Sequence, residues 1–454
     1  MEIDSHVPKS RENSANSPTD GQLSRRIGLL SLTLYGMGDI LGAGIYGLVG
    51  KAAGQLGNAV WLAFLTSMIA AGLTGLSYAA VGSRYPRAAG AAYVTLKAFR
   101  RSWLSYVVGL AALASGLTSM ATASRVFAGY LNASLPQLPL SLLIIGFLLL
   151  LAGIVYRGIR ESMWMNAVCT IIEISGLVLI ILVGASYLGE VNYMDARSDF
   201  NPSGDISTSL ILGGAVLTFY SFIGFEDILN VSEEVKDPKR NVPRGLLFAV
   251  AGASLIYITI SLIAVSVVPA ADLAKSSQPL VDVMAVAAPW FPSSLYSMIA
   301  MFAVANTALL NYVMGSRLLY GMAHQGLLPS ALGRVDSRTR TPHVAIATIL
   351  AIVLLLGLSG NISDLAKATS VLLLACFILV NLSLIKLKLD GPTPPGTFDV
   401  PLAIPILGSL ACLAMLVNAK LPEYLVAGGI LLLIGVLYFV KRPDESAIER
   451  MDME

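Results

Sequence analysis

A short stretch within the first apolar segment of the chain combines glycines with an acid. Residues 36–47 hold five glycines together with Asp39, where a helix that spans lipid would be uniformly apolar. Glycine weakens a helix, and a charge in hydrocarbon is costly. Interrupted helix at membrane depth is tolerated only where it is buried in protein or lines a water-filled cavity. We therefore expect Gly42, Ala43 and Gly44 to break the helix and to form part of a binding site halfway across a bilayer.

Close helix packing is the alternative explanation for these glycines. Gly38, Gly42 and Gly50 would allow two helices to approach each other, as small residues at regular spacing do. Packing alone does not explain why an acid accompanies the glycines.

A second stretch of the same kind lies in a later apolar segment, at residues 221–227. Its sequence, Ser-Phe-Ile-Gly-Phe-Glu-Asp, again combines glycine with acids. An unwound segment frees N–H and C=O groups that a continuous helix would use internally. The N–H groups at the start of the following half-helix suit a carboxylate, and freed carbonyls suit an ammonium group or a metal cation. The two breaks together predict a site for a zwitterion such as an α-amino acid.

Four acids lie within apolar segments, where an acid suggests a function by default. They are Asp39, Glu173, Glu226 and Asp227. Burial disfavours the charged form of such a group, which can then load and release a proton as access alternates. Asp39 stands about one helical turn before Gly42 and would contact a cationic group of the substrate, exchange protons, or satisfy freed backbone donors. Asp227 is expected nearer the cytoplasm and in contact with solvent.

The composition indicates which elements must position these residues. The 454 residues are 56% hydrophobic and 13% charged, with a mean hydropathy of +0.74, whereas a soluble chain carries about 25% charged residues. A spanning helix needs about 20 mostly apolar residues. Such runs are expected near residues 27–50, 58–81, 102–130, 138–156, 163–187, 207–230, 244–268, 293–320, 343–359, 364–386, 402–419 and 422–440. The sequence therefore predicts an all-α integral membrane protein with about twelve transmembrane helices.

Basic residues gather in alternate links between these segments. Examples are Arg84 after the second segment and Lys236 after the sixth. By the positive-inside rule both termini face the cytoplasm, which agrees with an even number of spans. Residues 1–24 and 442–454 are then cytoplasmic tails, and the first tail is expected to be disordered. The protein itself is expected to be a multi-pass protein of the plasma (inner) membrane.

The two breaks fall at matching places in two blocks of similar length. Residues 25–187 would form a first repeat of five helices and residues 207–388 a second, with helices 1 and 6 discontinuous. Paired interrupted helices are typical of transporters built from inverted repeats. Residues 401–441 would add helices 11 and 12 outside this 5+5 inverted repeat.

Four motifs resemble those of a known transporter superfamily. Its unwound first helix is similar to residues 38–46, and its second signature to residues 219–226 with the loop 233–244. Further loop patterns match residues 83–90 and 326–329. The chain thus resembles the amino acid–polyamine–organocation (APC) superfamily, and within it bacterial permeases of the cationic amino acid transporter and arginine–agmatine exchanger type.

The resemblance implies roles for residues at both breaks. Backbone N–H groups around Ala43 and Gly44 would hold the substrate carboxylate, and the carbonyls of Ile40, Tyr220 and Ile223 would hold its amine. The ring of Tyr220 would cover the substrate as an aromatic gate, or it would be an ordinary interfacial tyrosine. The predicted substrate-binding residues are Ile40, Gly42, Ala43, Gly44, Ile45, Tyr220, Phe222, Ile223 and Asn311.

Two of the departures from the superfamily pattern concern candidate site residues. Asn311 stands where arginine exchangers have an aromatic residue, so cation–π stacking of a guanidinium would be lost. Its amide would bind a polar substrate side chain or pair with another helix. Glu173 stands at or near a position that is often lysine. It would carry a coupled proton, help to ligate sodium, or be a structural acid bonded to a neighbouring helix.

The candidate coupling or gating residues are therefore Asp39, Glu173 and Glu226. Glu226 follows the second break and fits the gating acid of the superfamily, with a purely structural pairing as the alternative.

These features predict a secondary active transporter of amino acids that works by alternating access, with proton-coupled symport or exchange. Amines or polyamines are the alternative substrates, and sodium is the alternative coupling ion. A channel would show repeated pore elements or charge rings, and an intramembrane enzyme would need a nucleophile with a base or a metal cluster. Neither pattern is found, since Cys169, Cys376 and Cys412 have unrelated spacings and the three histidines do not cluster.

No cofactor, metal site or nucleic-acid partner is expected, and the oligomeric state stays open.

Overall fold

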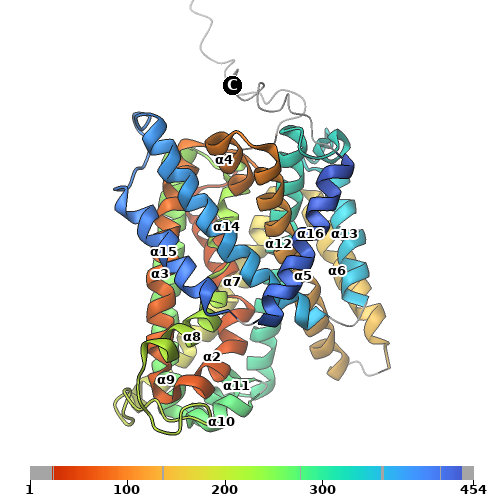
Figure 1. The fold of residues 1–454 in the computed structure, drawn as a ribbon. Helices are drawn as coiled ribbons and strands as arrows, with labels where there is room; N and C mark the ends of the chain where they lie inside the picture. The colour runs from red at the N-terminus through yellow and green to blue at the C-terminus, as the bar shows by residue number, and fades with distance from the viewer. Residues whose placement is uncertain are drawn as a thin grey trace, which may run out of the picture.

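The chain folds into a bundle of helices in the computed structural model (Figure 1). The structure describes residues 23, 25–134, 137–276, 278–358, 362–419 and 421–441. The predicted tails, 1–24 and 442–454, lie outside these residues apart from Leu23 and have no structural account. Among the described residues, the only β-structure is two isolated β-bridges. The predicted all-α class is therefore confirmed for this part of the chain.

Most helices coincide with the apolar segments that the sequence predicts. The longer ones are α1 (Leu29–Leu41), α2 (Ala43–Leu56), α3 (Val60–Arg84), α5 (Ser102–Ser134), α6 (Leu140–Arg157), α7 (Ile159–Gly184), α8 (Thr208–Phe219), α9 (Pro238–Val267), α12 (Ser293–His324), α13 (His343–Leu358), α14 (Ile362–Asp390), α15 (Ala403–Val417) and α16 (Leu421–Lys441). Three short helices in the links were not predicted: α4 (Gly90–Phe99), α10 (Ala270–Lys275) and α11 (Pro279–Ala287).

Many of these helices are suited to a lipid environment. Within the described part of the chain, nine segments are long and apolar enough to cross a membrane, and three shorter apolar helices accompany them. Large apolar side chains face outward, such as Leu182, Leu255 and Leu432, which are 70%, 71% and 72% exposed. In water such a surface would be costly, whereas lipid covers it. The chain is a multi-pass membrane protein.

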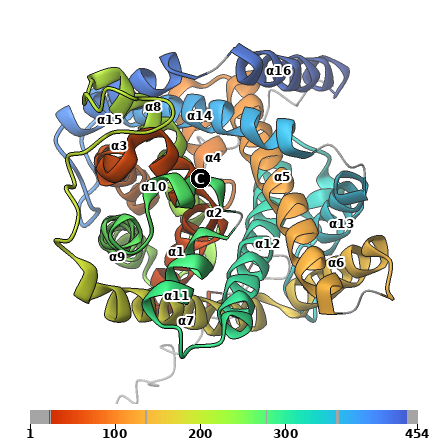
Figure 2. The same cartoon turned by 90° about the horizontal axis from the view of Figure 1, so that it is seen from below.

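The helix that carries the glycine-rich stretch lies in the interior of this bundle. Figure 2 shows α1 and α2 near its middle, and α1 packs against α7, α9 and α12. Helix α1 ends at Leu41, and α2 begins at Ala43 after Gly42, whose backbone angles are −50° and −144°. A Cβ atom on Gly42 would stand 2.1 Å from Oγ1 of Thr307 on α12. Glycine is therefore required where the chain bends against its neighbour.

The second predicted break interrupts the chain after α8. This helix ends at Phe219, and three 3₁₀ turns follow, Tyr220–Phe222, Phe225–Leu229 and Ser232–Glu234. Between the first two turns Ile223 is extended and Gly224 has a φ of +128°, a backbone conformation that glycine adopts readily and other residues rarely do.

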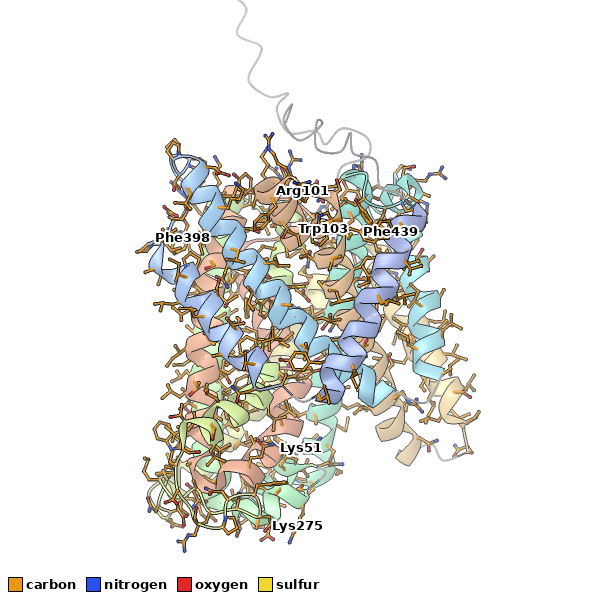
Figure 3. All side chains as sticks on the ribbon, in the orientation of Figure 1. Lys51, Arg101, Trp103, Lys275, Phe398 and Phe439 are labelled. Atoms are coloured by element: carbon orange, nitrogen blue, oxygen red, sulfur yellow. The ribbon has the colours of Figure 1, made fainter. Side chains whose placement is uncertain are left out.

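Basic side chains lie at both ends of the bundle. Figure 3 shows Lys51 and Lys275 at one end and Arg101 at the other. At the end with Lys51, α10 packs against α2. A Cβ atom on Gly50 would stand 2.3 Å from the carbonyl oxygen of Leu273. Gly50 thus allows α10, which the sequence analysis did not predict, to pack directly against α2.

A buried ion pair ties the loop after the second break to α12. Nε of Arg317 donates to Oε2 of Glu234 at 3.0 Å, and both side chains are fully buried. The carbonyl of Glu234 also accepts a hydrogen bond from the backbone of Ile27. The segment before α1, the loop after the second break and α12 are therefore joined at one end of the bundle.

Candidate functional site

The two helix breaks lie against each other. A Cβ atom on Gly44 would stand 2.7 Å from Cα of Ser221, and one on Gly224 would stand 3.0 Å from Cγ of Asp39. Each break thus uses a glycine where the other chain segment approaches most closely. This contact places the end of α1 and the start of α2 beside residues 220–227.

A tyrosine of α9 joins the two breaks. The hydroxyl of Tyr257 donates to the carbonyls of Ile40, before the first break, and of Ser221, at the second, the latter at 2.9 Å. The ring of Tyr257 is buried and packs edge-on against Phe222. Sequence reasoning missed this residue, because nothing in the apolar run around it marks it.

Replacing Tyr257 by phenylalanine should loosen this junction. The variant keeps the ring and loses only the donor that two buried carbonyls share, which should destabilise the fold by about 1–2 kcal/mol. We expect a lower melting temperature of the purified protein and slower transport in liposomes. Tyr312→Phe is the matched control, because its buried hydroxyl donates to the carbonyl of Ile346 on α13 at 2.8 Å, outside both breaks. Equal effects of the two variants would contradict a special role of Tyr257.

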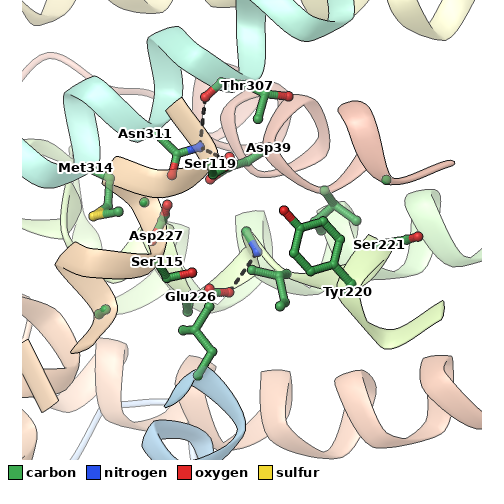
Figure 4. Close-up of a pocket in the computed structure, with 17 residues that line it drawn as sticks. Asp39, Ser115, Ser119, Tyr220, Ser221, Glu226, Asp227, Thr307, Asn311 and Met314 are labelled. Carbon is green, nitrogen blue, oxygen red and sulfur yellow. Dashed lines mark hydrogen bonds between the residues drawn. The ribbon is translucent and has the colours of Figure 1, made fainter. Parts of the chain in front are cut away.

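A polar cavity lies where the breaks meet (Figure 4). The volume open to the centres of water molecules is about 60 Å³, several times what one water molecule requires. It is lined by Asp39, Ile40, Gly44, Ala112, Ser115, Gly116, Ser119, Tyr220, Ser221, Ile223, Gly224, Glu226, Asp227, Thr307, Asn311, Met314 and Leu373. These residues come from both breaks and from α5, α12 and α14.

Seven of the predicted site residues line this cavity. They are Asp39, Ile40, Gly44, Tyr220, Ile223, Glu226 and Asn311. Gly42 instead contacts Thr307, Ile45 is fully buried in the core, and Phe222 packs on Tyr257. The backbone of Ala43 begins α2, and its side chain is outside the described set.

Three carboxyl groups face the cavity. Oε2 of Glu226 accepts from the backbone N–H of Gly224 at 2.8 Å, and Oδ2 of Asp39 has no hydrogen-bond partner within the described residues. The prediction for Asp227 was wrong. Its side chain is 6% exposed and lines the cavity instead of meeting solvent, because the chain after the break turns back toward α1 in 3₁₀ geometry instead of continuing outward as a helix.

Asn311 faces both the cavity and a neighbouring helix. Its Nδ2 donates to the carbonyl of Thr307 at 2.9 Å and lies 3.5 Å from Oγ of Ser119 on α5 (Figure 4). The amide therefore links α12 to α5 at the cavity wall. Its position is compatible both with binding a polar substrate side chain and with pairing to another helix, the two alternatives that the sequence left open.

Glu173 lies outside the cavity, on α7. The side chain is fully buried, and neither carboxyl oxygen has a hydrogen-bond partner among the described residues. Tyr46, four residues after the first break, places its hydroxyl 3.5 Å from the carbonyl oxygen of Glu173. A polar cluster of Asn166, Thr170 and Asn306 lies on the same side of α1 and surrounds Gly38.

Several cavity residues escaped the sequence analysis. Ser115 and Ser119 lie on α5, Thr307 and Met314 on α12, and Leu373 on α14. Small residues at positions 112, 115, 116 and 119 recur every three to four residues, the spacing of one helix face. That face is the signal that could have identified the α5 wall.

The arrangement can bind opposite charges at one place. Helix α2 starts at the cavity, and its N-terminal N–H groups have no side-chain cap, so they suit an anion. The carboxyl groups of Asp39, Glu226 and Asp227 suit a cation. Such a pair of subsites fits a zwitterionic ligand.

The chain has relatives of known function. It matches the family described as Amino acid permease over residues 27–440. It is 27% identical to the branched-chain amino acid permease BcaP of Bacillus subtilis (strain 168), over 94% of this chain and 95% of that protein. It is 30% identical to the methylthioribose transporter of the same organism, over 86% and 87%. It is also 30% identical to cationic amino acid transporter 4 of Mus musculus, over 84% of this chain and 62% of that protein.

A multi-pass helical protein whose interrupted helices meet at a polar cavity is a membrane transporter. The match over residues 27–440 shows that the chain belongs to the amino acid permease family of the APC superfamily. The resemblance seen in the sequence is thereby confirmed, and the protein is a transporter and not an enzyme.

Proposed function

We propose that the chain is a secondary active transporter of amino acids that works by alternating access. The observation that carries the proposal is the meeting of the two breaks at one polar cavity, where α2 begins and three carboxyl groups converge. The names of two relatives agree with it, since one is a branched-chain amino acid permease and the other a cationic amino acid transporter.

The substrate carboxylate is best placed at the start of α2, near the N–H groups of Gly44 and Ile45. For the amine, the carbonyl of Ile223 is a better candidate than two others named from the sequence. The carbonyl of Ile40 already accepts from Tyr257, and that of Tyr220 accepts from the backbone of Ile223 at 3.2 Å.

Amine or polyamine transport is the second candidate. The cavity offers carboxyl groups from Asp39, Glu226 and Asp227, and no basic side chain is among its described lining residues. This charge balance favours a substrate with an excess positive charge, or a proton taken up together with a neutral amino acid.

Coupling to a proton is part of the proposal. Burying an ionised carboxylate without a partner costs several kcal/mol, and Glu173 has no partner within the described residues. A proton on Glu173 removes that cost, while Glu226 and Asp39 at the cavity would gate access. Sodium remains the alternative ion, with no metal centre, cofactor or nucleic acid required.

The proposed topology has twelve spans with both termini in the cytoplasm of a plasma membrane protein. Nine long segments and three shorter apolar helices together support that number. The breaks after Leu41 and after Phe219 each fall in the first helix of a five-helix block, which supports the 5+5 inverted repeat with α15 and α16 added.

Ligand screening followed by exchange tests this function. Purified protein is heated with each amino acid and with amines and polyamines, since a ligand of the folded state raises the melting temperature. Hits are then tested for exchange of labelled substrate in liposomes. We expect saturable exchange of an amino acid that also protects against heating. Protection by amines alone would favour the second candidate, and flux that does not saturate would indicate a channel and contradict the proposal.

A further inference from the structure

A second hollow, which shares no lining residue with the cavity between the two breaks, lies where α6 ends and α7 begins. Its volume is about 470 Å³, and its walls are residues 156–161, residues 338–340 of the loop before α13, and Arg26 of the segment before α1. Because α6 and α7 meet at the end of the bundle where α5 starts, this hollow lies at the same end as Arg101 (Figure 3).

Arginines dominate the wall of this hollow. Five of them line it, namely Arg26, Arg157, Arg160, Arg338 and Arg340, against the single acid Glu161. The formal charges of these five arginines and Glu161 sum to +4. In the part of the chain that the structure describes, no ion pair involves Arg157, Arg160 or Arg338. The nearby Asp336 is engaged by the backbone N–H groups of Arg338 and Thr339, both at 2.9 Å.

The backbone adds to this positive field. Helix α7 is 26 residues long and starts at Ile159 in the wall of the hollow, and its N-cap Gly158 offers no side-chain acceptor. Arg160 thus stands at the positive end of a helix dipole, where a cation is destabilising. The guanidinium groups of Arg157, Arg160 and Arg338, gathered beside a helix N-terminus, repel one another unless an anion lies among them.

The hollow opens beside the lipid-facing surface. Tyr156 at its rim is 43% exposed, and Trp164, one turn beyond Arg160, is 65% exposed. Tyrosine and tryptophan at this level are typical of the membrane–water interface. Leu149 and Leu150 on α6 continue the apolar surface toward the membrane interior, at 51% and 61% exposed.

We propose that this hollow binds the phosphate headgroup of an anionic membrane phospholipid. Guanidinium groups bind phosphate oxygens through paired hydrogen bonds, and Arg157, Arg160 and Arg338 line the hollow. A lipid fits better than a free phosphate, because the exposed apolar face of α6 next to the headgroup would carry the acyl chains. Basic pockets between helices on the cytoplasmic side of membrane proteins are suited to such lipids.

Stability in lipid of defined charge tests the proposal. The full chain is placed in vesicles of phosphatidylcholine alone or with one fifth phosphatidylglycerol, and its melting temperature is measured. Phosphatidylglycerol should raise the melting temperature of the wild type by roughly 3–6 °C. The triple variant Arg157→Gln, Arg160→Gln, Arg338→Gln should lose this response. Arg101→Gln, Arg240→Gln, Arg244→Gln, which removes three exposed charges elsewhere, should keep it.

Three results would overturn the proposal. The first is a response of the triple variant equal to that of the wild type, and the second is an equal loss in the control variant, which would indicate general surface charge. The third is stabilisation by inorganic phosphate added to phosphatidylcholine vesicles, which would identify a free anion as the ligand. If the triple variant does not fold, Arg338→Gln alone, in an exposed loop, should still reduce the lipid response.

Discussion

Replacing Gly44 by alanine should reduce transport about 10- to 100-fold. The added Cβ would stand 2.7 Å from Cα of Ser221, which is backbone and cannot rotate away. Relief requires the two breaks to separate, and overpacking of this kind costs about 1–3 kcal/mol, with each 1.36 kcal/mol changing a rate about tenfold. Because the same breaks form the cavity, the shift also displaces Tyr220 and Ile223. Initial rates of labelled amino acid uptake into liposomes, at equal amounts of inserted protein, measure the effect.

Gly213→Ala is the matched control for this prediction. Gly213 lies in α8, six residues before the end of that helix, and a Cβ atom there would meet nothing within 4 Å. Alanine at such a position strengthens a helix, so wild-type uptake and an unchanged or higher melting temperature are expected. Full activity of Gly44→Ala would mean that the two breaks move apart freely, and the proposed site would then be wrong.

The positions of both breaks could be read from the sequence because they violate a local rule. A spanning helix has no need of five glycines and an acid in twelve residues, and Gly42 and Gly224 stand where the chain cannot continue as a helix. These residues are unusual for a spanning helix by their type alone, so they can be recognised without knowing how the helices pack. The same reasoning placed Asp39 and Glu226 at the cavity.

The remaining walls of the cavity could not be predicted in this way. Thr307, Met314 and Leu373 lie in ordinary apolar helices, and only the packing of α12 and α14 around the breaks brings them together. The error for Asp227 has a related cause. Asp227 was expected in contact with solvent, whereas the chain after Gly224 follows a 3₁₀ turn in which this residue is buried.

Glu173→Gln should remove the pH dependence of uptake while leaving substrate binding nearly intact. Glutamine has the shape of the protonated acid and cannot release a proton. Glu173 is fully buried and unpartnered among the described residues, so its ionisation in this conformation is costly, and release of the proton must await a rearrangement of α7 against α1. Because Glu173 lies outside the cavity, exchange of bound substrate should continue in the variant even though net uptake no longer follows the proton gradient.

Two measurements separate this role from the alternatives. Uptake is recorded between pH 5 and 8 with and without sodium, and labelled exchange is recorded in parallel. Glu190→Gln, an exposed carboxyl in the link that follows α7, should behave as the wild type. A loss of sodium stimulation in Glu173→Gln, with the pH profile kept, would assign the residue to a sodium site. An unchanged pH profile without any sodium effect would leave Glu173 a structural acid, and the proton would then have to travel through Asp39, Glu226 or Asp227 at the cavity itself.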